Sequence, residues 1–434
     1  MKNFLKRSGS VVLAAILFCV SPAAVFADEE SEVILKVLIK KGIISAQEVE
    51  EMKAEIRKEK SSTEAMVKEE APKPLEERVT ALEEKSGRVD LERIASKLKL
   101  KGRWAAGYYD SGKAGSFPSG SFEVPEAKLQ FTFDPDDINR VVLRMNLNNG
   151  TFNSIDFSYI DTDLEKLFGL PVALNSRLGR FKLNFGEETL ADNPVEASLP
   201  SNSVGKVSGN DEGLQLSGKL GKKKPLGYSV SITNGTTGTG SDTSTEKSFT
   251  GKLSYNVFEP IYVSASYYDS GSMKSSASEL SLGGLTARPG SALRWSREAW
   301  EVDARYDYQK GKTLNPPAFS DSKGIFRLAY GNFDDSVSEA DERTGAYGYV
   351  DGLYNLSNKF YVASRASFIA FNDDITASLS GISANEFQRF SLGGGYRLTG
   401  NTIFKVGYDW NKELGANTQE ADNNLMSMIL VSQF

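Results

Sequence analysis

The sequence predicts an all-β protein, a transmembrane antiparallel β-barrel of about sixteen strands, and three observations support this fold class. From Leu98 to the C-terminus, apolar residues alternate with polar ones in segment after segment, which is the period of a β-strand. These segments are roughly ten residues long, the length that a tilted strand needs to cross a bilayer. Beyond the N-terminus, no run approaches the ~20 apolar residues of a membrane-spanning helix.

Residues 1–27 have the features of a secretory signal peptide. Three basic residues precede an apolar run from Val11 to Val20, and small residues stand before the expected cleavage after Ala27. The run is too short for a membrane anchor. We therefore expect the mature chain to leave the cytoplasm.

The composition disfavours most catalytic and metal-binding functions. The only cysteine, Cys19, lies in the predicted signal peptide, and the chain contains no histidine. The usual general base, the commonest zinc ligand and all disulfides are thereby missing. We expect no enzyme, no cofactor and no metal site. Loss of the three basic residues of the signal peptide changes the formal net charge from −6 to −9, which disfavours a nucleic-acid partner.

Residues 28–97 are rich in charge and follow a helical period. The stretch from Ile34 to Ile56 predicts a short helical hairpin, and residues 60–74 predict a linker with two prolines. Apolar residues between Leu75 and Val89 fall near heptad spacing. Two heptads do not separate a trimerising periplasmic coiled coil from a solvated charged helix, so both interpretations stay open.

Residues 98–434 make up the predicted barrel, and its clearest alternation runs from Gly179 to Gly186. Because side chains of a strand point alternately to its two faces, one face of this stretch is apolar and the other is cationic. The residues expected to contact lipid or a neighbouring subunit are Phe181, Leu183 and Phe185. By the same reasoning, an earlier strand is expected to turn Ile155, Phe157 and Tyr159 to lipid.

The connections between predicted strands alternate between short and long, as in barrels with short periplasmic turns and long outer loops. Two connections break this alternation, since residues 161–172 and 310–323 are long where short turns are expected. The strand count therefore carries an error of two. The long loop from Glu187 to Asn210 is a candidate for folding inward and narrowing a channel; the alternative is an outer surface loop.

The face opposite the apolar one carries many cations and fewer acids. We predict a lumen lined by Arg140, Arg144, Arg180, Lys182, Arg305, Arg327, Arg365, Arg389, Arg397 and Lys405. Arginine rings in a narrow aqueous pore favour anions and phosphates. The alternative is an unselective pore in which these cations are solvated or paired across strands.

The chain ends in an amphipathic strand, Met426 to Phe434, whose last residue is phenylalanine. This ending resembles the signal by which the outer-membrane assembly machinery recognises its clients. Aromatic residues cluster near predicted strand ends, where they anchor barrels at membrane interfaces. The expected partners are therefore outer-membrane lipid and that assembly machinery.

The stretch Gly179-Arg180-Phe181-Lys182, followed by Phe185-Gly186-Glu187, resembles a segment of the phosphate-selective porins O and P. The helical stretch through Lys41-Gly42-Ile43-Ile44 is similar to segments that precede the barrel in bacterial relatives of that family. Asn184 stands where the family usually has proline. The resemblance implies a homotrimeric, sixteen-stranded channel in the outer membrane of a Gram-negative bacterium.

Two functions follow as expectations. The first is a porin for passive diffusion of small hydrophilic solutes or ions, biased toward small anions, with phosphate among the candidates. The second is a barrel that sheathes a partner, such as the cytochrome of a porin–cytochrome electron conduit; the chain has no Cys-x-x-Cys-His site, so any haem would belong to that partner. An outer-membrane hydrolase is disfavoured by the missing histidine.

Overall fold

The computed structural model describes residues 97–147, 154–188, 193–221, 225–235, 246–273, 280–283, 285, 294–309, 322–337, 342–371, 377–379, 382–415 and 420–434. The predicted signal peptide and the predicted helical segment with its linker lie outside these residues. So does most of the long connection 310–323.

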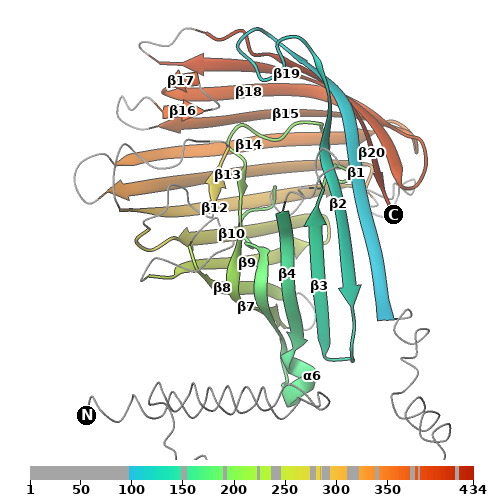
Figure 1. The fold of residues 1–434 in the computed structure, drawn as a ribbon, viewed down its shortest axis with the longest axis vertical. Helices are drawn as coiled ribbons and strands as arrows, with labels where there is room; N and C mark the ends of the chain where they lie inside the picture. Colours follow the sequence, from blue (N-terminus) through green and yellow to red (C-terminus); the bar gives the residue numbers. More distant parts are fainter. Residues whose placement is uncertain are drawn as a thin grey trace, which may run out of the picture. The chain divides into compact units, whose positions relative to one another are not determined.

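Sixteen strands form one closed antiparallel barrel (Figure 1). In spatial order they are β1 (Leu98–Ser111), β2 (Ser121–Phe133), β3 (Asn139–Asn146), β4 (Ser154–Asp163), β5 (Ala173–Lys182), β7 (Asn210–Leu220), β8 (Leu226–Thr233), β9 (Ser248–Phe258), β10 (Ile261–Asp269), β12 (Trp295–Tyr308), β13 (Gly324–Val337), β14 (Arg343–Asn355), β15 (Phe360–Phe371), β18 (Glu386–Arg397), β19 (Thr402–Leu414) and β20 (Leu425–Gln433). The predicted fold class is confirmed. Two small ribbons accompany the barrel: β6 (Val207–Ser208) pairs with β11 (Ser281–Leu282), and β16 (Ala377–Leu379) pairs with β17 (Ile382–Ala384).

The C-terminal strand β20 closes the barrel by pairing with both β1 and β19. The backbone of Phe434 exchanges two hydrogen bonds of 3.0 Å with that of Gly102. A Cβ on Gly102 would lie 2.2 Å from the Phe434 ring. The glycine therefore leaves space for the ring of the last residue.

The connection between β4 and β5 contains a short helix, α6 (Leu164–Phe168), which explains its length. The Asp163 side chain accepts a hydrogen bond from the backbone N–H of Lys166, and Gly169, at φ 64°, ends the helix in the left-handed conformation. Among the described residues, no helix is long and apolar enough to span a membrane.

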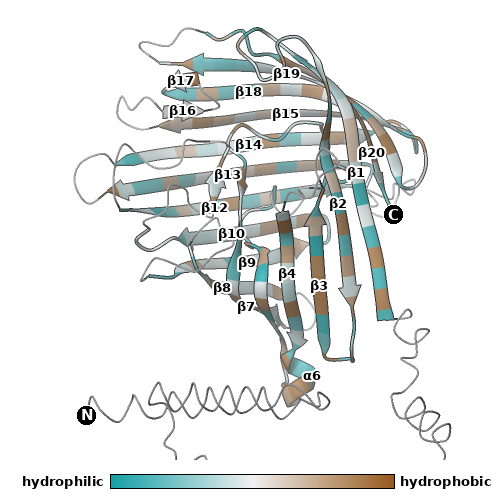
Figure 2. Ribbon diagram, in the orientation of Figure 1, coloured by the Kyte–Doolittle hydropathy of each residue, from teal (hydrophilic) through white to brown (hydrophobic). Residues whose placement is uncertain are grey.

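Hydrophilic and hydrophobic residues alternate along many of the strands, as the colours of Figure 2 show, and the side chains of a strand point alternately to its two faces. On β12, Trp300 and Val302 are 42% and 47% exposed, whereas Glu301 and Asp303 between them are 4% and 1% exposed. Along this part of β12 the outer wall is thus apolar, and the inner wall is polar and covered. This arrangement is the reverse of a soluble protein and fits a barrel surrounded by lipid.

The apolar residues after Gly179 lie inside the barrel, so their predicted contact with lipid is wrong. Phe181, Leu183 and Phe185 have no exposed surface, whereas Leu178 is 62% exposed on the outer wall. Phe181 faces the lumen beside Asp211, its fully buried partner on β7. The strand ends at Lys182 and the chain then enters the lumen, so the apolar residues serve an inner core.

The assignment of the β4 aromatic residues to lipid is also wrong. A register shift between Arg144 and Met145 places a bulge in the pairing of β3 with β4. One extra residue reverses the faces of the side chains that follow it. Phe157 and Tyr159 consequently turn inward, and Ile160, 48% exposed, faces outward.

Candidate functional site: a loop inside the barrel

The segment between β5 and β7, residues 183–209, crosses the barrel interior, and we call it the lumen loop. Its described parts contact side chains of β9, β10, β12, β14, β15, β18 and β19. The sequence-based candidate for an inward loop, Glu187 to Asn210, overlaps most of this segment. Residues 189–192 lie outside the described part.

Two apolar clusters fix the loop to the inner wall. Leu183, Phe185, Val204 and Val207 of the loop are buried with inward residues of the strands, which include Tyr268, Phe333, Tyr347, Ile369, Phe371 and Phe387. Val195 and Leu199 are buried in a second cluster with Ala105, Ile325, Leu353, Ile403, Ile429 and Val431. Burial of such side chains stabilises the loop by roughly 1.5–3 kcal/mol each, so the loop is a rigid part of the wall.

At Gly186 the loop lies close against the inner wall. Its φ is +63°, and a Cβ at this position would lie 2.5 Å from Glu301 Oε1. Its N–H donates to Ser266 Oγ at 3.0 Å, and its carbonyl accepts from Lys252 Nζ at 2.7 Å. Only glycine combines this conformation with this approach.

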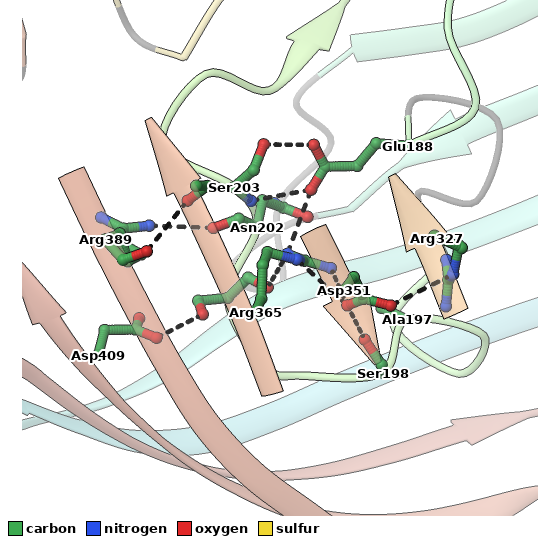
Figure 3. Close-up of polar contacts among 12 residues, drawn as sticks. Glu188, Ala197, Ser198, Asn202, Ser203, Arg327, Asp351, Arg365, Arg389 and Asp409 are labelled. Carbon is green, nitrogen blue, oxygen red and sulfur yellow. Dashed lines mark hydrogen bonds and ion pairs between the residues drawn. The ribbon is translucent and has the colours of Figure 1, made fainter. Parts of the chain in front are cut away.

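A charged network on β14 and β15 holds the middle of the loop (Figure 3). Arg365 donates to Asp351 Oδ2 at 3.0 and 3.2 Å and to the carbonyl of Ser201 at 3.1 Å. Ser198 donates to the same carboxylate at 2.7 Å. Glu188 pairs with Arg365 at 3.2 Å and accepts from the Ser203 N–H at 2.8 Å, so it joins both arms of the loop to the wall.

Backbone carbonyls of the loop accept from two further cations. Lys405 Nζ donates to the carbonyls of Pro194 and Ala197, and Arg389 donates to the carbonyl of Asn202 at 3.1 Å. Lys405 has no exposed surface. Both cations therefore support the loop, and Lys405 does not face open water.

Carboxylates gather where the loop meets β10 and β12. Glu187 accepts from Tyr262 at 2.5 Å and pairs with Lys252 at 2.7 Å, while its N–H donates to Asp303 at 3.2 Å. Glu301 accepts from Tyr347 at 3.0 Å. Among the described residues, no group of three or more such side chains is arranged to hold a metal ion.

A connected network of charged side chains on β1–β4 faces the lumen. Lys128 Nζ lies 2.8 Å from Asp156 and 3.4 Å from Glu126, Arg103 pairs with Glu126, and Arg144 pairs with Asp156 at 3.2 Å. We call these five residues the basic network. Three cations face two acids, so the network carries one excess positive charge.

Two arginines of this wall lie flat on aromatic rings. The Arg144 guanidinium carbon lies 3.6 Å from the centroid of Phe157, and that of Arg177 lies 4.0 Å from the centroid of Tyr159. Arg177 also donates two hydrogen bonds to Asp161, at 2.7 and 3.0 Å. Arg177 is not among the residues predicted to line the lumen, because it shares a face of β5 with Phe181, which the alternation assigns to lipid.

The other residues predicted to line the lumen divide into three groups. Arg305 and Arg327 lie on the inner face beside Asp307 and Asp351. Arg140 and Arg397 lie near turns, bonded to Asp134 and to Asn355. Hydrogen bonds from Arg140 and Lys99 hold the pKa of Asp134 at about 2. Arg180 and Lys182 share the outer face of Leu178, so the structure corrects their predicted place in the lumen.

No family model and no curated protein matches the sequence. Solved structures do resemble the chain. The outer membrane channel DcaP of Acinetobacter baumannii superposes with a TM-score of 0.54 at 12% identity, covering 78% of this chain and 97% of that one.

The barrel has the fold of outer-membrane porins. OprB of Pseudomonas putida matches with a TM-score of 0.51 at 11% identity, over 80% of this chain and 97% of that one. An anion-selective porin from Comamonas acidovorans matches with a TM-score of 0.50 at 12% identity, over 78% and 99% of the two chains. At these identities the likeness concerns the fold.

Proposed function

We propose that the protein is an outer-membrane porin that lets small hydrophilic solutes diffuse passively. The observation that carries this proposal is the lumen loop, which is fixed to the inner wall by two apolar clusters and by Arg365 and Lys405. A rigid loop inside a barrel narrows the channel. Because the loop is fixed, it does not move to close the channel. The porin fold of the barrel supports the same conclusion.

We further propose an anion bias, with phosphate among the candidate solutes. The support is the basic network with its excess positive charge, together with the ring-stacked Arg144 and Arg177. Cations in a narrow pore raise the local concentration of anions. One of the similar folds is an anion-selective porin.

The test is a planar-bilayer recording of the purified chain under a tenfold KCl gradient. We expect a reversal potential that favours chloride. The double variant Lys128→Gln/Arg144→Gln should shift it toward the cation side, whereas the control Lys166→Gln, on α6, should not. A cation-selective wild type would overturn the bias, and absence of conductance would overturn the channel.

The alternative of a barrel that sheathes a cytochrome is less well supported. The lumen loop and its apolar contacts occupy part of the interior that a partner would need. Haem absorbance in a gentle pull-down of the barrel from its membrane would favour the sheath over the porin.

We also propose that copies of the chain associate through the outer wall near Arg180. The guanidinium of Arg180, on β5, pairs with Glu212, on β7, at 2.9 Å. Both residues lie on the outer face, which also carries the exposed Leu178. Charges that face lipid destabilise a barrel, so cover by a second copy is more favourable. A homotrimer is the assembly that we propose.

A further inference from the structure

The outer wall contains a hollow near the end of the barrel that carries the short turns. It is a cavity of about 470 Å³ over β12–β15 and β18, and we call it the lower trough. Its exposed, outward-facing side chains are Tyr306, Tyr308, Phe326, Tyr354, Val362 and Leu392. The hollow is therefore apolar with an aromatic rim.

Small residues make the floor of the lower trough. Gly352 and Ser364 lie in register between Phe326 and Leu392, so four neighbouring strands present large, small, small and large side chains. A Cβ added to Gly352 would meet nothing within 4 Å. The floor is open enough to receive a narrow apolar chain lengthwise.

Two lysines stand at the turn end of the trough. Lys323 Nζ lies 5.2 Å from the ring centroid of Tyr354, and Lys359 Nζ lies 6.0 Å from that of Tyr396. Lys323 immediately precedes β13, and Lys359 lies in the turn between β14 and β15. Within the described part of the chain, no carboxylate pairs with either ammonium.

We propose that the lower trough binds an acyl chain of an anionic phospholipid of the inner leaflet, whose phosphate is held by Lys323 and Lys359. Membrane proteins bind anionic head groups through basic residues at the bilayer surface, directly beside an apolar face. The positive charges of Lys323 and Lys359 favour a lipid with a negatively charged phosphate over a neutral apolar partner. This lipid site lies on the outer wall, so it is separate from the passage of solutes and does not depend on the ion selectivity of the channel.

The test is native mass spectrometry of the delipidated full chain in detergent, with added dioleoyl phosphatidylglycerol or dioleoyl phosphatidylcholine. The wild type should retain the anionic lipid in preference to the zwitterionic one. Lys323→Gln and Lys359→Gln should each reduce this preference about fivefold, from the typical attraction of one lysine at a membrane surface. The control Lys99→Gln, at the same end of the barrel on β1, should leave it unchanged.

A second pair of variants tests the trough itself. Gly352→Leu fills the floor and should reduce retention of both lipids. The control Gly251→Leu places a side chain on the outer face of β9, where a Cβ would meet only the Phe249 ring, at 3.4 Å, and should retain them.

Four results would overturn the proposal. The first three are equal retention of the two lipids by the wild type, full retention by Gly352→Leu, and equal losses in the control variants. A changed oligomeric mass of Gly352→Leu without lipid loss would assign this face to a second copy and also overturn it. The wild-type comparison needs no variant, so misfolding of a variant does not remove the test.

Discussion

The ammonium of Lys405, on β19, donates a hydrogen bond of 2.5 Å to the carbonyl oxygen of Pro194 in the lumen loop. The side chain has no exposed surface. Lys405 was predicted to line the open lumen, but its ammonium instead binds backbone carbonyls of the loop and anchors the loop to β19. The position of the loop therefore depends on Lys405.

Lys405→Met should loosen the lumen loop while preserving the length of the side chain. The carbonyls of Pro194 and Ala197 lose their donor, and a buried acceptor without a donor costs about 1–3 kcal/mol. We expect a lower free energy of unfolding in urea and a larger, noisier single-channel conductance. Lys219→Met, at an exposed end of β7, is the control. Unchanged stability would show that Lys405 does not anchor the loop.

Phe185→Ala should destabilise the barrel strongly, because the ring is fully buried in the first loop cluster. Truncation of a buried phenylalanine typically costs 3–5 kcal/mol. The matched control is Leu178→Ala, which truncates a residue 62% exposed on the outer wall. Urea unfolding in detergent measures both. Similar losses in the two variants would contradict the inner position of Phe185.

The alternation of the sequence predicts the barrel and its strand faces well where a strand is regular. On β12 and β19 the outward aromatic residues Trp300 and Trp410 are exposed as expected. The alternation fails at two places for separate physical reasons. A bulge reverses the faces around Phe157, and Phe185 follows the end of β5, where the same pattern serves a loop core.

The inner cations were predictable as a set, but their partners were not. Arg365 on β15 lies directly opposite Asp351 on the neighbouring strand β14. The loop carbonyl that Arg365 binds belongs to Ser201, more than 150 residues away in the sequence. Such pairs depend on strand register and on the path of the lumen loop. A single sequence shows neither the strand register nor the path of the loop. It therefore does not distinguish the cations that face open water from those that the loop covers.

Arg180→Leu tests the outer position of this side chain and the proposed association of copies. Its loss leaves Glu212 unpaired on the outer wall, and an unpaired charge there is unfavourable. We expect dissociation of the oligomer, measured by light scattering coupled to size exclusion, with an unchanged reversal potential in bilayers. A shifted reversal potential would instead place Arg180 in the lumen. The double variant Arg180→Leu/Glu212→Leu should restore most of the lost stability.

Acid should weaken the turn between β2 and β3 only at very low pH. Hydrogen bonds from Arg140 and then Lys99 hold the pKa of Asp134 at about 2, below its ordinary value of 3.8. A carboxylate with a lowered pKa stabilises the fold above its ordinary pKa, and this contribution is lost as the pH falls through about 2. Asp134 is partly exposed to solvent, which screens its interactions, so the effect is small.

The measurement is the urea midpoint of wild type and Asp134→Asn between pH 7 and pH 2. The difference between them should be constant above about pH 5, decrease below it and be largely lost by about pH 2. Arg140→Gln removes the main donor and brings the pKa of Asp134 closer to its ordinary value, so its own loss of stability in acid should be smaller and should be complete at a higher pH than in wild type. A difference between wild type and Asp134→Asn that persists unchanged at pH 2 would show that Asp134 acts through its shape and not through its charge.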